Sequence, residues 1–192
     1  MRLALLALGV LLLASGARAQ AVDASRIPDD APDWRTVEGA ADEARDEGKL
    51  LLIHGYATWC GWCARLDEDV YTDDTVQAYL AENFEGARLD IENRETVDFF
   101  DYTLPGAWLA AGLGITSTPT TIFVDPETGE TITRLPGYAD AETFLYALRF
   151  VREGAYAELS FQEFVDAQKA AGEVEDSAAP ADEDAPLIPL GE

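Results

Sequence analysis

Both cysteines of the chain lie in one pentapeptide, Trp59-Cys60-Gly61-Trp62-Cys63. An apolar run over 50–53 precedes it and a helix-like stretch begins at Ala64, which predicts a strand-to-helix junction. At a helix N-terminus, unpaired backbone N–H groups and the helix dipole stabilise a thiolate, so Cys60 is the predicted nucleophile. Cys63 lies one turn later on the same helical face and is the predicted resolving thiol, which closes a disulfide with Cys60.

A Cys-x-x-Cys pair can also form a purely structural disulfide or half of a metal site. A disulfide across this spacing closes too small a loop to add much stability. A zinc site needs additional Cys or His ligands, and the chain contains two cysteines and one histidine in all. The sequence therefore favours redox chemistry by the thiols themselves, without a metal or another cofactor.

The only histidine, His54, precedes Cys60 by six positions inside the apolar stretch 49–56. Such a continuous apolar stretch predicts a strand buried on both faces in the middle of an α/β sheet. There His54 can be a neutral core residue, or it can be the base that takes the proton of Cys63. An imidazole has an ordinary pKa of about 6.5, and burial lowers it, so His54 would be neutral and able to accept a proton at pH 7.

Aromatic residues flank the cysteines and fill a later segment. Trp59 and Trp62 can be core packing, but beside Cys60 they favour a partly exposed apolar platform for a protein substrate. The segment 92–114 is also rich in aromatic residues and has a Pro105-Gly106 turn. It is either a packed insertion or an apolar wall beside the active site.

Periodic patterns of apolar residues along the chain predict the helices and strands that position these residues. The expected helices are 35–47, 64–70, 75–82, 141–153 and one from the capping-box pair Ser160 and Glu163 to about Ala171. The expected strands are 49–56, 84–91, 121–125 and 130–135, with the last two joined as a hairpin. The order indicates one α/β domain.

The ends of the chain have a different character. Residues 1–19 are typical of a cleaved secretory signal, with a basic start, an apolar centre and Ala17-Arg18-Ala19 at the cleavage site. We expect a loose leader over 20–33, the folded domain over 34–171 and a disordered acidic tail over 172–192. The apolar run is too short for a stable membrane anchor, so the protein is expected to be exported, to a periplasmic or other extracytoplasmic location.

The chain is strongly acidic, with 37 Asp and Glu residues against 13 Lys and Arg residues and a net charge of −24. Loss of Arg2 and Arg18 with the signal would change that charge to −26. Such a surface repels nucleic acid and anionic lipid. The acidic residues are spread along the whole chain, which favours adaptation to high salt over an ordinary acidic protein and predicts stability that rises with salt.

The order of elements, together with three motifs, resembles the thioredoxin superfamily over about 34–164. The motifs are Trp59-Cys60-Gly61-Trp62-Cys63, Thr118-Pro119-Thr120 and Gly137-Tyr138. Within the superfamily, the pattern from Cys63 to Tyr71 and Leu135-Pro136-Gly137-Tyr138 are similar to exported thioredoxin-related proteins, including those found with sulfur-oxidation systems. The implied fold is a central mixed β-sheet flanked by helices, with an insertion before the Thr-Pro strand.

The resemblance implies that Pro119 is cis and faces the cysteine pair, and that Thr118 offers backbone hydrogen bonds to an extended substrate. A trans Pro119 that merely begins an edge strand is the alternative. The sequence departs from ordinary thioredoxins at Trp62, where they usually have Pro, and at His54, where they usually have a buried Asp. Arg88 occupies the place of their neighbouring Lys.

These features predict an exported thiol–disulfide oxidoreductase, a monomer that reduces protein disulfides. Because an oxidising compartment removes electrons from thiols, a membrane electron donor is expected to re-reduce the pair. One alternative is a disulfide oxidase or isomerase. Another is a chaperone that binds copper through Cys60 and Cys63, although further His or Met ligands near the motif are lacking.

Overall fold

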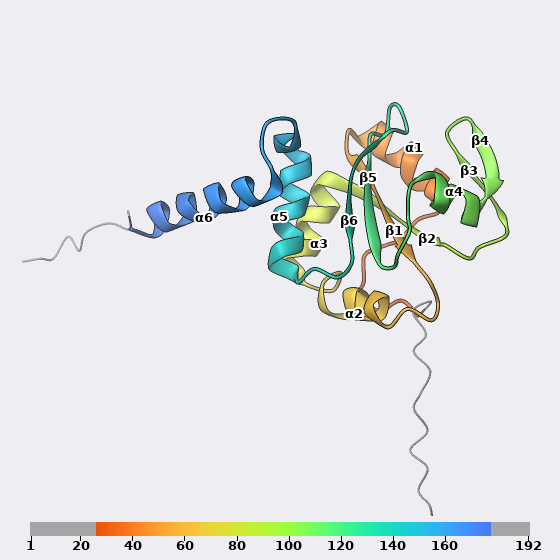
Figure 1. The fold of residues 1–192 in the computed structure, drawn as a ribbon, viewed down its shortest axis with the longest axis horizontal. Helices are drawn as coiled ribbons and strands as arrows, with labels where there is room; N and C mark the ends of the chain where they lie inside the picture. Colours follow the sequence, from red (N-terminus) through yellow and green to blue (C-terminus); the bar gives the residue numbers. More distant parts are fainter. Residues whose placement is uncertain (1–25, 178–192) are drawn as a thin grey trace, which may run out of the picture.

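The protein is described by a computed structural model over residues 26–177 (Figure 1). The predicted signal over 1–19, the first part of the leader and the end of the tail lie outside the described residues. Within 26–177, no helix has the length and apolar character needed to cross a bilayer.

A mixed sheet of four strands lies at the centre of the fold, in the order β2-β1-β5-β6. The strands are β1 (Leu50–Tyr56), β2 (Phe84–Asp90), β5 (Thr120–Val124) and β6 (Thr131–Pro136). Strand β1 pairs in parallel with β2 and antiparallel with β5, and β5 pairs antiparallel with β6. The predicted strand positions and hairpin are confirmed to within one or two residues, and the predicted thioredoxin fold is confirmed.

The described residues form six α-helices, of which α6 extends away from the sheet (Figure 1). They are α1 (Val37–Glu47), α2 (Gly61–Asp69), α3 (Asp74–Asn83), α4 (Gly106–Gly112), α5 (Ala141–Arg152) and α6 (Phe161–Ser177), and a 3₁₀ turn spans Ala155–Ala157. Two of them begin at a capping aspartate: Asp73 accepts hydrogen bonds from backbone N–H groups at the start of α3, and Asp140 accepts one at the start of α5. Gly48 ends α1 with a φ of 68°, a conformation that glycine adopts without steric cost.

The hydrophobic core has two halves, one on each face of the sheet. Because side chains alternate along a strand, Leu51 and Ile53 of β1 point to one face and Leu52 points to the other. The first face is covered by α1 and α4, and the second by α2, α3 and α5. Strand β1 is therefore buried on both faces, as its sequence predicts.

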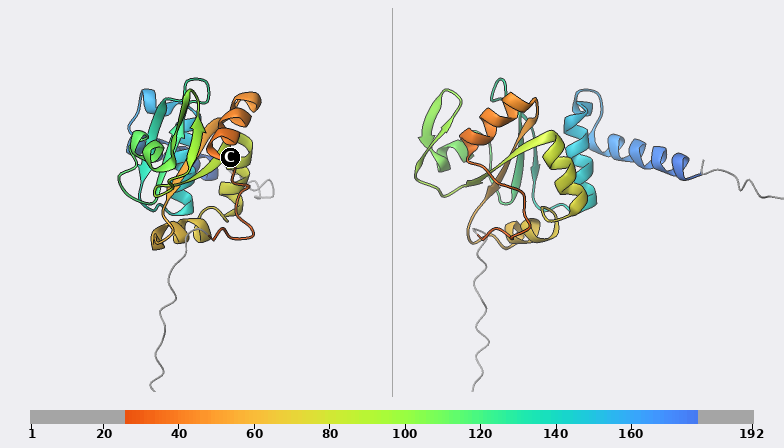
Figure 2. Two further views of the ribbon diagram at one scale, coloured as in Figure 1. Left: turned by 90° about the vertical axis from the view of Figure 1, so that its right-hand side faces the viewer. Right: turned by 180° about the vertical axis from the view of Figure 1, so that it is seen from behind.

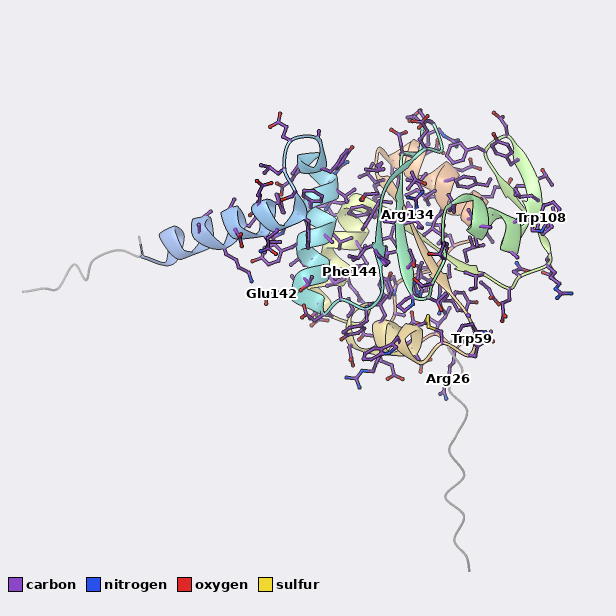
Figure 3. All side chains as sticks on the ribbon, viewed as in Figure 1. Arg26, Trp59, Trp108, Arg134, Glu142 and Phe144 are labelled. Atoms are coloured by element: carbon purple, nitrogen blue, oxygen red, sulfur yellow. A yellow bond between two sulfur atoms is a disulfide. The ribbon has the colours of Figure 1, made fainter. Side chains whose placement is uncertain are left out.

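The segment 92–114 is a folded insertion on the α1 side of the sheet. It contains a short antiparallel hairpin, β3 (Thr96–Phe99) and β4 (Tyr102–Pro105), followed by α4. Phe99 is buried in the half of the core that α1 and α4 cover, as expected of a packed insertion. Trp108, in contrast, is 70% exposed. Trp108 lies well away from Trp59 in Figure 3, so it does not form a wall beside the cysteines.

The last helix differs from the prediction. Helix α6 continues to Ser177, past the predicted end at Ala171. Where the predicted disordered tail begins stays a prediction. The predicted capping box at its start is confirmed, since Ser160 and Glu163 exchange hydrogen bonds. Alanine and glutamate near residue 172 are good helix formers, and they offset the single glycine there. Figures 1 and 2 show α6 extending away from the rest of the domain.

Candidate active site

The cysteine pair lies at the N-terminus of α2, directly after β1, where the sequence places it. Cys60 is the residue that caps the helix, and its Sγ accepts the backbone N–H of Cys63 at 3.1 Å. The two cysteines form a disulfide, with Cα atoms 5.2 Å apart. Cys60 is 4% exposed and Cys63 is fully buried, so a substrate reaches the Cys60 sulfur more easily than the Cys63 sulfur.

Two tryptophans adjoin Cys60 and Cys63 in the chain and a tyrosine packs on one of them, and we call Trp59, Trp62 and Tyr138 the aromatic rim. Trp59 and Trp62 are each 62% exposed. The Trp59 indole N–H donates to the Glu92 carboxylate at 3.0 Å, and the Trp62 ring lies 5.4 Å from the Tyr138 ring. A depression of about 340 Å³ lies between Trp62, Tyr138 and Arg65. Figure 3 shows the disulfide beside Trp59 at one end of the sheet.

The Thr118–Pro119 peptide bond is cis, as the family resemblance implies. Thr120, the next residue, pairs with Gly55 near the end of β1 that leads to the cysteines. This register places Thr118 and Pro119 at the same end of the sheet as the disulfide. The Pro119 carbonyl accepts the N–H of Gly137 at 2.8 Å, which ties the motif to the turn before Tyr138. Substrate binding by Thr118 stays a prediction.

A cluster of buried charged side chains lies under α2, and we call His54, Asp67 and Arg88 the buried charged cluster. Their side chains are 0%, 1% and 6% exposed. Arg88 Nη2 donates to Asp67 Oδ2 at 2.8 Å, and the other carboxylate oxygen, Oδ1, lies 3.7 Å from His54 Nε2. His54 and Arg88 are neighbours because they are paired in the β1–β2 register.

Aromatic rings connect this cluster with its surroundings. The Tyr56 ring lies under the Arg88 guanidinium at 4.1 Å and stacks on His54 at 6.0 Å. Tyr56 also packs against the small core that contains Cys60 and Cys63, so it contacts both the surroundings of the disulfide and the buried charged cluster. Tyr71 meets the His54 ring edge to face at 5.2 Å, and its hydroxyl lies 3.3 Å from the Thr121 hydroxyl.

Burial shifts the pKa values of Asp67 and His54 in opposite directions. It raises the pKa of Asp67 to about 7, although the nearby Arg88 charge opposes this shift. Burial, together with Arg88, lowers the pKa of His54 to about 3. His54 is therefore neutral at pH 7, as expected from the sequence, and its contact with Asp67 is not an ion pair. Burial also raises the pKa of the Tyr71 hydroxyl.

Asp67 is the site residue that the sequence reasoning missed. Its position carries a usable signal, because Asp67 follows Cys63 by one helical turn and so shares the face of α2 that packs on the sheet. The chemical role of His54 stays a prediction. Within residues 26–177, no group of three or more His, Cys, Asp or Glu side chains is arranged to hold a metal ion.

Comparison with known proteins agrees with this geometry. The Thiol:disulfide interchange protein DsbD of Ralstonia nicotianae is 30% identical over 116 residues, which cover 59% of this chain and 17% of that protein. The chain thus spans less than a fifth of the length of the curated relatives it matches.

Solved structures are also similar. A putative disulphide-isomerase from Bacteroides thetaiotaomicron is 30% identical, with a TM-score of 0.52 over 68% of this chain and 98% of that one. A thioredoxin from Thermus thermophilus is 26% identical, with a TM-score of 0.52 over 62% and 85% of the two chains. Residues 37–152, more than half of the chain, match the family described as Thioredoxin-like domain. The chain therefore belongs to the thioredoxin-like family.

Proposed function

We propose that this protein is an exported thiol–disulfide oxidoreductase that reduces disulfides in other proteins. The observation that carries the proposal is the Cys60–Cys63 disulfide at the N-terminus of α2, with Cys60 at the accessible side. A helix N-terminus stabilises a thiolate at Cys60 once the pair is reduced. The relatives named Thiol:disulfide interchange protein support the same class of reaction.

The proposed reaction has two steps. The Cys60 thiolate attacks one sulfur of a substrate disulfide, forms a mixed disulfide and releases the first substrate thiolate. Cys63 then loses its proton and attacks the Cys60 sulfur, which closes the Cys60–Cys63 disulfide and releases the second thiolate. The substrate gains two electrons and the protein loses two. The exposed Trp59 and Trp62 rings offer apolar surface to a protein substrate, and Thr118 offers backbone hydrogen bonds.

Reductive work outside the cytoplasm needs a supply of electrons, because that compartment oxidises thiols. We propose that a membrane electron donor re-reduces the pair and that the protein acts as a monomer. The predicted signal over 1–19 supports export. Nucleic acid is an unsuitable partner for a chain with a net charge of −24.

Insulin reduction tests the proposal. Catalytic amounts of the protein should accelerate the reduction of insulin by dithiothreitol, and Cys60→Ser should abolish the acceleration. An isomerase is the second candidate, which the similarity to a putative disulphide-isomerase favours. Recovery of scrambled ribonuclease activity without net insulin reduction would support the isomerase and contradict the reductase.

A further inference from the structure

The second step of the proposed reaction requires a proton acceptor near Cys63, which is fully buried. We propose that Asp67 takes up the proton that Cys63 loses when Cys63 attacks a mixed disulfide, and that Arg88 and His54 hold the Asp67 carboxylate in place for this. The inference rests on the proposed function, because it concerns the resolving step of that reaction.

The position of Asp67 on α2 is the first support. Cys63 and Asp67 are four residues apart in one helix, which places their Cβ atoms about 6 Å from each other on one face. Both side chains are buried, at 0% and 1% exposure. Bulk water is thus kept from both groups, and Asp67 is the carboxylate that shares the buried face of the helix with Cys63.

The two carboxylate oxygens of Asp67 have different surroundings. Oδ2 is held by Arg88 Nη2 at 2.8 Å, which fixes the orientation of the group. Oδ1 is buried and has no hydrogen-bond partner, and neither does His54 Nε2, which it faces at 3.7 Å. A buried acceptor without a partner costs free energy, so its presence calls for a role. One oxygen is positioned and the other is free to receive a proton.

The proton affinities distinguish Asp67 from His54. With a pKa of about 7, the Asp67 carboxyl exists in both forms near neutral pH and can accept and return a proton. With a pKa of about 3, His54 would carry a proton in about one molecule in ten thousand at pH 7. His54 is thus a positioning residue. The charged and titratable groups around Asp67 are Arg88 from β2, His54 from β1, Glu68 from α2, and Tyr71 from the segment after α2.

In this step one proton passes from Cys63 to Asp67 and then to the leaving thiolate. The Cys63 thiol gives its proton to the Asp67 carboxylate, and the Cys63 thiolate attacks the Cys60 sulfur of the mixed disulfide. The bond between Cys60 and the substrate sulfur breaks, and the substrate leaves as a thiolate with the electron pair. That thiolate takes a proton from Asp67 through solvent, which restores the carboxylate.

Single-turnover kinetics with a small aromatic disulfide separates attack from resolution, because the first released thiolate and the closing of Cys60–Cys63 are observed in sequence. In the unaltered protein, resolution should accelerate as the pH rises through about 7, because Asp67 must be ionised to accept the proton. Asp67→Asn should slow resolution about a hundredfold at pH 8, the lower end for loss of a general base, and should remove this pH transition. Attack by Cys60 should change much less.

Glu68→Gln is the matched control, because it removes a negative charge from the neighbouring, exposed position of α2. Glu68 contributes to the raised pKa of Asp67, so this variant should keep the transition at a slightly lower pH. Equal slowing of both steps by Asp67→Asn would show a merely structural role and overturn the inference. Resolution at the parental rate would overturn it too. If the unaltered protein forms no mixed disulfide at all, it is the proposed function that fails.

A second measurement covers the case in which Asp67→Asn does not fold, since that change leaves Arg88 buried without its carboxylate partner. Carbon-13 NMR of labelled aspartate carboxyls in the unaltered protein follows Asp67 directly. We expect its signal to titrate near pH 7, far above the range of exposed aspartates. An Asp67 signal that stays in the ionised position between pH 5 and pH 9, roughly two units either side of that value, would overturn the inference.

Discussion

The aromatic rim and the buried charged cluster both include a residue of α2, the helix that begins at the disulfide, and they differ in nearly every physical property. The rim is exposed, and its tryptophans each leave more than half of their surface in water. The cluster is buried and consists of groups that ordinarily carry charge. Burial of exposed aromatic surface against a binding partner stabilises the complex, whereas burial of an unpaired charge destabilises the fold. In the proposed function, this difference gives substrate contact to the rim and proton handling to the cluster.

The largest effect should come from a change in the disulfide itself. Cys63→Ser leaves Cys60 able to attack but removes the thiol that resolves the mixed disulfide, so turnover should stop and substrates should remain bound covalently. Non-reducing electrophoresis before and after dithiothreitol measures the trapped species. Cys60→Ser is the control and should trap nothing. Trapping by Cys60→Ser in place of Cys63→Ser would reverse the assigned roles.

A change in the cluster should affect resolution and not substrate binding. His54→Leu keeps the volume approximately but removes the imidazole that faces Asp67, so resolution should slow by roughly ten- to a hundredfold, no more than loss of the base Asp67 itself, while attack by Cys60 changes less. Stopped-flow measurement of the two steps checks this. If the folded variant resolves at the parental rate, His54 is only a core residue.

A change in the rim should have the opposite pattern. Trp62→Ala removes an exposed contact worth about 1–2 kcal/mol, so KM for a protein disulfide should rise by roughly five- to thirtyfold. The rate with a small aromatic disulfide should stay within about twofold, because such a substrate does not span the rim. Trp108→Ala is a matched control, since Trp108 is equally exposed but lies on α4, away from the disulfide. Equal losses in both variants would remove the rim from substrate recognition.

Salt should have the smallest effect and should act on the exposed surface far more than on the cluster. Salt screens the repulsion among exposed acids, whereas the buried Arg88–Asp67 pair at 2.8 Å is screened much less. A gain of about 1 kcal/mol would raise the melting temperature by roughly 2–4 °C in a domain of this size. Calorimetry between dilute buffer and molar potassium chloride measures it. A flat or falling melting temperature would contradict adaptation to high salt.

Much of the fold follows from local patterns in the sequence. The apolar run of β1, the capping box of Ser160 and Glu163, and the cysteine pair each predict their element from nearby residues, and the structure has those elements. The small hairpin in 92–114 was not predicted, because its strands are four residues each and show no clear alternation.

The candidate site was only partly predictable, because part of it depends on contacts between distant segments. Cys60 and Cys63 are identified by their spacing alone. The cluster brings together Asp67 from α2, His54 from β1 and Arg88 from β2, and the pairing of His54 with Arg88 depends on a strand register that the sequence does not specify. An aspartate in the middle of an acidic helix also resembles an ordinary surface residue, which is why its burial was missed.

The reduction potential of the Cys60–Cys63 couple tests the central claim most directly. Equilibration with glutathione or dithiothreitol at pH 7, followed by alkylation and mass spectrometry, gives the fraction of disulfide at each ratio. Reducing proteins of this fold have potentials of about −270 mV, and strongly oxidising ones about −120 mV. A protein-disulfide reductase should lie near the first value. A potential near the second would mean that the protein donates disulfides, which would contradict the proposed direction of electron flow.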